Sequence, residues 1–387
     1  MKLFALLTSL QPDAVGTLPL GVFALGVRRS TAAKLSRLLL ILGLAGTAIA
    51  QTSPNVSPFA HGLNNPRGLK FGPDGNLYVA EGGAGGDISS AGQAVQVVPH
   101  IGPYTGGYTA RISKITPNGT ITTVVDGLPS SQTSDESDKL VSGVADVAFV
   151  GHTLYAILAV AGASHGLVGT NNGVLRVNPD GSTTFIANLS DFQKSHPTAV
   201  NEDEDFEPDG TWYSMIAVRG ALYAVEPNHG ELVVIDPVSG KINRVADISA
   251  SQGHSVPTAV AYDGNFYVGN LRTFPIVEGS SKILKITPSG QVKVYATGFT
   301  TVVGLAFDGQ HRLYVLENTT GEGNLFPTPF TGKISRIEHS GKVVEIATGL
   351  FLPTAMTFGP DGNLYVSNIG FGPPPIGLGE IVKVTIP

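Results

Sequence analysis

The chain has 387 residues, of which 42% are hydrophobic and only 14% are charged, and its formal net charge is −6. An acidic chain lacks the basic footprint that nucleic-acid binding requires, and the absence of cysteine excludes disulfides, thiolate metal sites and cysteine nucleophiles. The 49 glycines and the large apolar fraction instead favour a folded, turn-rich, mostly β chain.

The N-terminal region has the pattern of an export signal. Basic residues within 28–37 precede the run LLLILGLAGTAIA at 38–50. This order is typical of a secretory signal peptide, and the run is shorter than the roughly 20 apolar residues that span a bilayer. We therefore expect residues 1–50 to be an upstream extension with a signal peptide, and 51–387 to be a secreted or periplasmic domain. An uncleaved membrane anchor is the alternative.

A nonapeptide, FGPDGNLYV, occurs at 71–79 and again at 358–366, and weaker copies lie between the two. The last three intervals between copies are 44, 47 and 51 residues, close to the period of about 40–50 residues seen in propeller blades. The two earlier intervals are longer because they carry insertions. The tyrosines that align the six copies are Tyr78, Tyr155, Tyr223, Tyr267, Tyr314 and Tyr365.

Each copy is followed by a second strand–turn–strand segment, such as KILKITPSGQVKVYA at 282–296. The strands alternate apolar and polar residues, and turns such as Asp-Gly, Asn-Gly and Ser-Gly supply the positive φ of tight hairpins. No segment with a helical period separates the strands. Six repeats of four strands predict an all-β, six-bladed β-propeller.

The last repeat stops one strand short at Pro387. The segment 53–63, which precedes the first repeat, has the composition of the missing strand. We therefore predict that it forms the outer strand of the blade that contains 351–387. This arrangement would pair the two ends of the domain in one sheet and leave no open edge in the ring.

The phase of the repeat sorts the loops onto two faces. Turns within hairpins are short, whereas connections between hairpins and between blades are long. Because a rigid scaffold presents function on its loops, we predict that the long-loop face binds a small molecule, a glycan or a protein; the alternative is that the insertions only pack. The long connections are 81–109, 129–141, 160–172, 187–212, 269–281, 318–331 and 368–378.

The residue three places after each aligned tyrosine is a carboxylate or an amide in five of the six repeats. Oxygen ligands that converge on the ring axis could hold a hard cation such as Ca²⁺. Alternatively, each side chain accepts hydrogen bonds from backbone amides of a neighbouring blade. The five candidate metal ligands are Glu81, Glu226, Asn270, Glu317 and Asn368, and Leu158 is the exception.

Arg67 is the only charge at a position of the innermost strands that small or β-branched residues otherwise fill. We expect it near the mouth of the central channel. An unpaired buried guanidinium is costly, so it needs an acid, and the nearest candidates by repeat phase are Glu81, Asp146 and Glu317. Arg67 forms either a structural ion pair or a fork for an anionic or carbonyl-bearing ligand.

Histidines and one acidic stretch complete the candidates on the long-loop face. His165, His229 and His254 fall on that face but form no motif. The stretch NEDEDFEPDG at 201–210 lacks the spacing of an EF-hand, so it is either a loose cation site or a solvated loop. No G-x-S-x-G, P-loop or HExxH motif is present, which leaves serine-hydrolase and NTPase functions without local support.

Four stretches of the chain resemble the ScyD/ScyE family of secreted propeller proteins, which is named from gene clusters for the sunscreen pigment scytonemin. The resemblance covers nearly all of 55–387, extends to the broader NHL and gluconolactonase-like six-bladed class, and implies the fold; no catalytic set carries over. The stretches are NNPRGLKFGPDGNLYVAEGG, VSGVADVAFVGHTLYAI, FEPDGTWYSMIAVRGALYAVEPNHGELVVIDP and SVPTAVAYDGNFYVGNL.

We therefore expect an exported propeller that binds its ligand on the long-loop face without chemistry of its own. The resemblance implies an accessory role in secondary-metabolite, scytonemin-like biosynthesis. The alternative function is a metal-assisted lactonase or lyase that uses the ring of carboxylates and amides, with a loop histidine as base. No nucleic-acid partner is expected. Candidate ligand contacts at the channel mouth are Arg67, Asp146, His165, His229 and His254.

Overall fold

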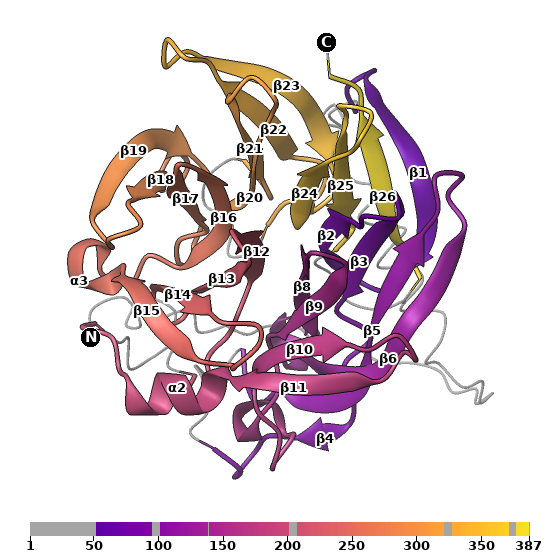
Figure 1. Cartoon of the computed structure of the whole chain (residues 1–387), viewed down its shortest axis with the longest axis vertical. Helices are drawn as coiled ribbons and strands as arrows, with labels where there is room; N and C mark the ends of the chain where they lie inside the picture. Colours follow the sequence, from indigo (N-terminus) through magenta and orange to yellow (C-terminus); the bar gives the residue numbers. More distant parts are fainter. Residues whose placement is uncertain are drawn as a thin grey trace, which may run out of the picture. The chain divides into compact units, whose positions relative to one another are not determined.

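The computed structural model describes residues 52–94, 101–137, 139–200, 207–320, 327–370 and 377–386. These residues form six antiparallel sheets arranged in a ring, seen along its axis in Figure 1. The six-bladed all-β propeller expected from the repeats is confirmed. The predicted leader lies outside the described residues. Within them, no helix has both the length and the apolar character needed to cross a bilayer.

Blades 1 to 3 follow one another along the chain. Blade 1 contains β2 (Pro66–Phe71), β3 (Leu77–Glu81), β5 (Thr105–Ile115), β6 (Ile121–Gln132) and β7 (Val141–Ser142), with β4 (Ile88–Ser89) paired to β5. Blade 2 contains β8 (Val144–Val150), β9 (Thr153–Leu158), β10 (Gly173–Val177) and β11 (Thr183–Asn188). Blade 3 contains β12 (Ser214–Val218), β13 (Ala221–Glu226), β14 (Glu231–Ile235) and β15 (Ile242–Asp247).

Blades 4 to 6 complete the ring. Blade 4 contains β16 (Pro257–Asp263), β17 (Asn265–Asn270), β18 (Ser281–Ile286) and β19 (Val292–Phe299). Blade 5 contains β20 (Val302–Phe307), β21 (Leu313–Glu317), β22 (Gly332–Ile337) and β23 (Val343–Leu350). Blade 6 contains β24 (Ala355–Phe358), β25 (Leu364–Asn368), β26 (Gly379–Val384) and β1 (Val56–Leu63).

The ring closes through β1, as predicted for the segment 53–63. β1 pairs antiparallel with β26 from Val56 opposite Val384 to Leu63 opposite Gly379, and the two strands lie side by side in Figure 1. Leu63 is fully buried in a cluster that also contains Tyr365 of β25. β1 therefore joins the last blade by backbone hydrogen bonds and apolar burial, and the His61–Glu380 contact at 3.1 Å adds to them.

The repeated nonapeptide forms the same turn and the same contact at both positions. In the first copy the Asp74 carboxylate accepts hydrogen bonds from the Asn76 amide at 2.7 Å and from the Tyr78 hydroxyl at 3.0 Å. The ring of Tyr78 then packs edge-on against Phe149 of the next blade, with centroids 5.0 Å apart. Tyr365 repeats both contacts, with Asp361 and with Phe71. The motif thus sets the hairpin turn and also holds neighbouring blades together.

Two local features differ from the sequence expectation. The β5–β6 hairpin includes 105–109 and 129–132, which the sequence predicted to be loop. Glycines allow neighbouring backbone to approach this extension closely. A Cβ on Gly86, for example, would lie only 2.2 Å from the Gly106 carbonyl oxygen. Helices also occur in the connections. They are α2 (Leu189–Ser195), α3 (Ser249–Gln252) and 3-10 turns at Asp135–Ser137 and Ala163–His165.

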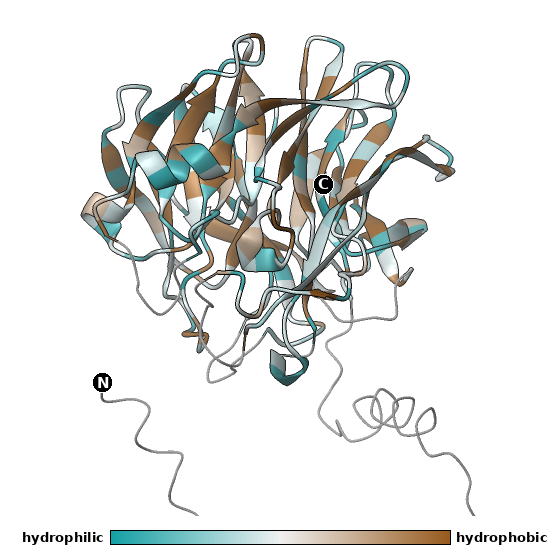
Figure 2. Cartoon of the chain, turned by 90° about the horizontal axis from the view of Figure 1, so that it is seen from below, coloured by the Kyte–Doolittle hydropathy of each residue, from teal (hydrophilic) through white to brown (hydrophobic). Residues whose placement is uncertain are grey.

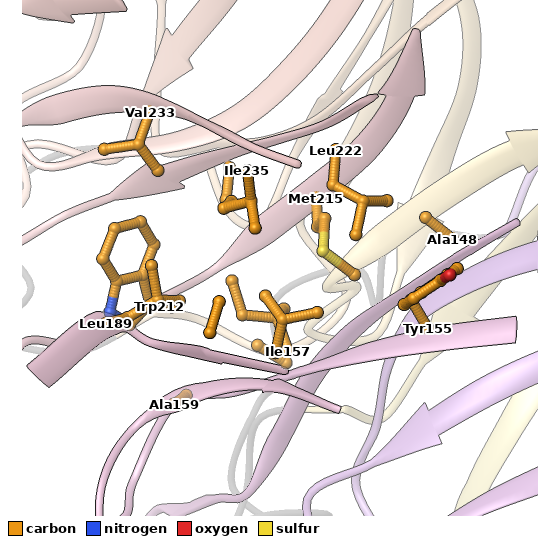
Figure 3. Packing of buried hydrophobic residues seen from close by; sticks show 14 of the residues in the cluster. Ala148, Tyr155, Ile157, Ala159, Leu189, Trp212, Met215, Leu222, Val233 and Ile235 are labelled. Atoms are coloured by element: carbon orange, nitrogen blue, oxygen red, sulfur yellow. The ribbon is translucent and has the colours of Figure 1, made fainter. Parts of the chain in front are cut away.

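The core consists of apolar clusters, the largest of which lies between blades 2 and 3. Trp212 is 1% exposed and packs among Leu189, Val233 and Ile235, as Figure 3 shows. α2 contributes Leu189 to this cluster and begins where the Asn188 side chain accepts a hydrogen bond from the Asp191 amide. The helix therefore fixes the start of the connection that leads into blade 3.

Candidate functional site

The two faces of the ring differ as the repeat phase predicts. Turns within hairpins project from the upper edge of Figure 2, and the longer connections gather along the lower edge. The innermost strand of every blade starts at the long-loop face and ends at the short-turn face. Side chains near the start of these strands therefore stand at the long-loop mouth of the central channel.

The central channel is lined by the innermost strands of all six blades. Its free volume is about 50 Å³, enough for a few water molecules but far below the roughly 300 Å³ of small-ligand pockets. This cavity is therefore too small for a ligand of that size, and the mouths of the channel are the candidate places for one. Lys70 lies inside the ring, among the innermost strands. Its side chain is nevertheless exposed to solvent, because it faces the water-accessible space of the channel. Burial lowers the pKa of Lys70, and the nearby charge of Asp146 opposes that shift.

Asp146 connects the innermost strands of three blades. Its carboxylate accepts hydrogen bonds from the backbone N–H groups of Val147 and Met215, both at 2.8 Å, and from the Ser214 hydroxyl at 3.2 Å. It also lies directly on the backbone of Gly68, where a Cβ would stand 1.9 Å from Asp146 Oδ1. Burial raises the pKa of Asp146 to about 6, although these hydrogen bonds and Lys70 oppose the shift. Asp146 is a channel-wall residue that links blades 1, 2 and 3.

Arg67 and Tyr213 stand together at the long-loop mouth. Arg67 is 7% exposed, and its guanidinium carbon lies 5.2 Å from the centroid of the Tyr213 ring. The Tyr213 hydroxyl donates to the Thr354 carbonyl oxygen at 3.2 Å, so this side chain reaches from blade 3 to blade 6. Burial raises the pKa of Tyr213, Asp146 adds to the shift and Arg67 opposes it. The structure thus brings Arg67 and Asp146 together around a tyrosine.

The acid expected for Arg67 is not found within the described part of the chain. Glu81 pairs instead with Arg111, at 2.7 Å from its Nε, and Glu317 pairs with Lys333 at 3.2 Å. Among the residues that the structure describes, the guanidinium donates only to the Gly370 carbonyl oxygen at 3.4 Å and to the Ser142 hydroxyl at 3.3 Å. A guanidinium has five N–H donors, so Arg67 is a buried cation with few and long hydrogen bonds.

The repeated carboxylates and amides have a structural role in the five blades that carry them. Each is the last residue of its blade's second strand. The Glu81, Glu317 and Asn368 side chains accept hydrogen bonds from the backbone N–H of Asn64, Thr300 and Phe351, which precede the first strand of the same blade. Glu226 does the same with Thr211, and Asn270 donates to the Ser255 carbonyl oxygen at 2.7 Å. The position therefore fastens the connection that enters the blade in five of the six blades, and blade 2, with Leu158, is the exception.

These side chains do not converge on the axis. Among the residues that the structure describes, no group of three or more His, Asp or Glu is placed to hold a metal ion. The Ca²⁺ site formed by Glu81, Glu226, Asn270, Glu317 and Asn368 stays a prediction, and the oxygen atoms it requires are engaged in hydrogen bonds. Of the two interpretations that the sequence left open, hydrogen bonding to backbone amides describes these contacts, within each blade rather than between neighbours.

His165 belongs to a second, buried polar cluster on the long-loop face. Its Nδ1 lies 3.1 Å from the Ser131 hydroxyl and its Nε2 lies 3.2 Å from a Glu207 carboxylate oxygen. The Tyr104 hydroxyl donates to the other oxygen of Glu207 at 2.7 Å. Burial acts to raise the pKa of Glu207, but the interactions with His165 and the hydrogen bonds from Thr211 and Tyr104 together lower that pKa.

The order serine, histidine and carboxylate is that of an acyl-transfer triad. Here Ser131 and His165 are each 2% exposed and Glu207 is 5% exposed. Ser131 also pairs on both sides within its sheet, with Gly106 and Ser142. A hydroxyl enclosed in this way cannot meet a carbonyl substrate, so the three residues act as a buried hydrogen-bonded link between the blade 1 hairpin and the loop of blade 2.

His229 adjoins this cluster through the loop between β13 and β14. Its Nδ1 lies 3.3 Å from a Glu226 carboxylate oxygen. Burial acts to lower the pKa of His229, but Glu226, Glu231 and Glu207 together raise it. Burial also raises the pKa of Glu231 to about 7, against the opposing effect of Arg244. Glu207 therefore brings His165 and His229 into one cluster, separate from Arg67 and Asp146.

The remaining candidates are His254 and the acidic stretch 201–210. His254 is half-buried in the connection between α3 and β16, next to the buried Ser255. The expectation of a solvated acidic loop is wrong for Glu207 and Asp209, because both are buried; Asp209 accepts hydrogen bonds from Lys194 and Ser164. Residues 201–206 of that stretch lie outside the described residues.

Sequence reasoning missed Lys70 and Tyr213. Lys70 fits the alternation of apolar and polar residues along β2, so nothing in the sequence marks it as unusual. Only the arrangement of the blades shows that its side chain faces the channel. Tyr213 stands directly before β12 in the run TWYS, where an aromatic pair at the start of an innermost strand was the available signal.

Comparisons with known proteins support the fold. No protein-family model and no curated protein sequence matches the chain. Among solved structures, it is similar to an oxidoreductase described as a glucose dehydrogenase from Thermus thermophilus, with 16% identity, a TM-score of 0.53, and coverage of 87% of this chain and 100% of that one. A second glucose dehydrogenase shares 15% identity at a TM-score of 0.51, with 86% and 100% covered.

A gluconolactonase from Xanthomonas campestris is also similar, with 10% identity, a TM-score of 0.48, and coverage of 86% of this chain and 89% of that one. At such identities a likeness concerns the fold alone. The two glucose dehydrogenase structures thus support the β-propeller fold of this chain and nothing finer.

Proposed function

We propose that this protein is an exported binding propeller that holds an anionic or carbonyl-bearing small molecule at the long-loop mouth of its channel. Arg67 provides the charged fork and Tyr213 provides the aromatic face beside it. An accessory role in secondary metabolism belongs to the same proposal and rests on the ScyD/ScyE resemblance alone.

One observation carries this proposal. Arg67 is 7% exposed, and within the described residues it has no carboxylate in ion-pair distance and donates only two hydrogen bonds, both longer than 3.2 Å. Leaving a buried cation without an opposite charge costs several kcal/mol, on the order of 3–5 in measured cases. A carboxylate or carbonyl oxygen of a ligand would provide the missing acceptor in bidentate geometry.

The alternative function, a metal-assisted lactonase or lyase, has less support. Its ring of carboxylates and amides is engaged in hydrogen bonds to the connections of the blades. The serine, histidine and carboxylate link of Ser131, His165 and Glu207 is enclosed. Hydrolysis of a δ-lactone by the purified protein, followed as acid release, would favour the alternative.

The binding proposal is tested by calorimetry with gluconate, citrate and benzoate, each compared with its uncharged amide. We expect saturable binding of at least one carboxylate and none of its amide. The Arg67→Met variant should lose that binding while it keeps the circular dichroism of the wild type.

Two further variants keep the test decisive. Arg67→Lys retains the charge but not the fork, so it should fold and bind more weakly. Arg219→Met is the control, because Arg219 is exposed in the β12–β13 turn on the opposite face. Equal binding by Arg67→Lys, Arg67→Met and wild type would overturn the proposal.

A further inference from the structure

A small cavity in blade 4 has the chemistry of an anion site. It lies on the long-loop side, where α3 and the start of β16 meet the end of β17 and the start of β18. Its volume is about 10 Å³, close to the minimum that holds one water-sized species. Its lining residues are Gln252, Ser255, Asn270, Arg272, Lys282 and Leu284.

The lining carries two positive charges without an acid. Arg272 and Lys282 are both half-buried. Within the described chain, every ion pair involves other residues, and neither Arg272 nor Lys282 donates a side-chain hydrogen bond. In a chain with a net charge of −6, two neighbouring cations that no carboxylate neutralises form a local field that attracts an anion.

A buried hydroxyl in the same cavity lacks a partner. Ser255 is 4% exposed, and its Oγ has no hydrogen-bond partner among the described residues. A buried polar group in this condition is destabilising, and an occupant of the cavity that accepts its hydrogen would offset that cost. Ser255 can donate its hydroxyl hydrogen to an anion at the same place where the two cations attract it.

The side chain of Asn270, which also lines the cavity, is already engaged in hydrogen bonds. The Asn270 side-chain oxygen accepts from the Lys282 backbone N–H at 2.6 Å, and its amide nitrogen donates to the Ser255 carbonyl oxygen at 2.7 Å. The wall therefore presents a hydroxyl donor, two cations and the neutral amide of Gln252 to its occupant, and no carboxylate. This set favours an anion over a cation.

We propose that this cavity binds a small inorganic anion, either chloride or one oxygen of a phosphate whose remainder faces solvent. The site lies in blade 4 and shares no residue with the channel mouth of Arg67 and Tyr213, so it does not depend on the function proposed above.

Binding is measured with two probes on the purified full chain: chloride by ³⁵Cl line broadening, and phosphate by calorimetry in a chloride-free buffer. The main variant is Arg272→Asn. Arg272 has a φ of 71°, and asparagine tolerates this left-handed conformation, so the substitution removes the charge without adding strain. Arg219→Asn is the matched control, because Arg219 has a φ of 51° on the opposite face.

We expect saturable binding of one of the two anions by wild type and by Arg219→Asn, and at least a tenfold weaker affinity in Arg272→Asn. Ser255→Ala should also weaken binding. If Arg272→Asn fails to fold, the anion affinity of Lys282→Gln is measured instead, and it should also be at least tenfold weaker than that of wild type. The absence of saturable binding by wild type, or wild-type affinity in the charge and hydroxyl variants, would show that the cavity holds only water and would overturn the proposal.

Discussion

Arg67 of blade 1 stacks on Tyr213 of blade 3, with 5.2 Å between the guanidinium carbon and the ring centroid, and Tyr213 in turn donates to Thr354 of blade 6. This arrangement joins three blades at the long-loop mouth of the channel. The aromatic face also offsets part of the cost of burying a cation that no described carboxylate neutralises.

Removing the Tyr213 hydroxyl should weaken this link without removing the stack. We expect Tyr213→Phe to lower the free energy of unfolding by about 1 kcal/mol, because one hydrogen bond is lost. Tyr213→Leu should lower it further, since the cation–π contact, about 0.5–2 kcal/mol, is lost as well. Urea unfolding of the three proteins measures both steps. Equal stability of the Phe and Leu variants would show that the stack contributes nothing.

Gly68 should not accept any side chain. A Cβ there would lie 1.9 Å from Asp146 Oδ1 and 2.6 Å from the Asp146 Cα, and the second contact is with backbone that cannot rotate away. We expect Gly68→Ala to cost at least about 1–3 kcal/mol of stability. Gly309→Ala is the control, because a Cβ at Gly309 meets nothing within 4 Å. Similar melting temperatures for the two variants would contradict the contact.

Closure of the ring through β1 should dominate global stability. Leu63 is 0% exposed, so we expect Leu63→Ala to cost about 2–5 kcal/mol. Val343 lies on the outer strand of blade 5 and is 48% exposed, so Val343→Ala should change stability by less than about 0.5 kcal/mol. Thermal unfolding compares the two. A small loss in the Leu63 variant would mean that β1 contributes little to holding the ring closed.

Glu231 should make part of the stability depend on pH. Because burial raises its pKa to about 7 in the folded protein, its protonated form is favoured by folding. Its contribution is therefore fully present below the unfolded pKa of about 4.3 and is lost as pH rises through about 7. The stability of wild type minus that of Glu231→Gln should fall by a few kcal/mol at most between about pH 4.5 and pH 8. A difference that stays constant with pH would contradict the shift.

Glu226 provides a test between the hydrogen-bonding and the metal interpretations of the repeated carboxylates. Its two oxygens accept from the backbone N–H groups of Thr211 and His229. In Glu226→Gln an amide NH₂ would face one of these donors, so we expect a loss of about 1–3 kcal/mol. We also expect EDTA to leave the melting temperature of wild type unchanged. A lower melting temperature in EDTA that added calcium restores would favour the Ca²⁺ site.

Much of the fold could be predicted from the sequence because its determinants are local and repeated. The alternation of strands such as KILKI and the Asp-Gly turns specify hairpins within a few residues, and their recurrence indicated the number of blades. The missing strand after 379–384 and the spare segment at 53–63 were sufficient to predict closure, since an unpaired sheet edge is unfavourable. The second occurrence of FGPDGNLYV has a similarly local explanation, since blades 1 and 6 use it for the same turn and for the same tyrosine contact with the next blade.

The candidate site depended on contacts that no local pattern encodes. The sequence placed Arg67 at the channel mouth, but only the tertiary structure showed that its neighbour is the aromatic Tyr213 rather than an acid. It likewise showed that Glu207 and Asp209, which read as a solvated acidic stretch, are buried against His165 and Lys194. The burial and the charge partners of these side chains depend on how the long loops pack over one another. That packing depends on the closure of the whole ring, whereas each hairpin depends only on its own residues.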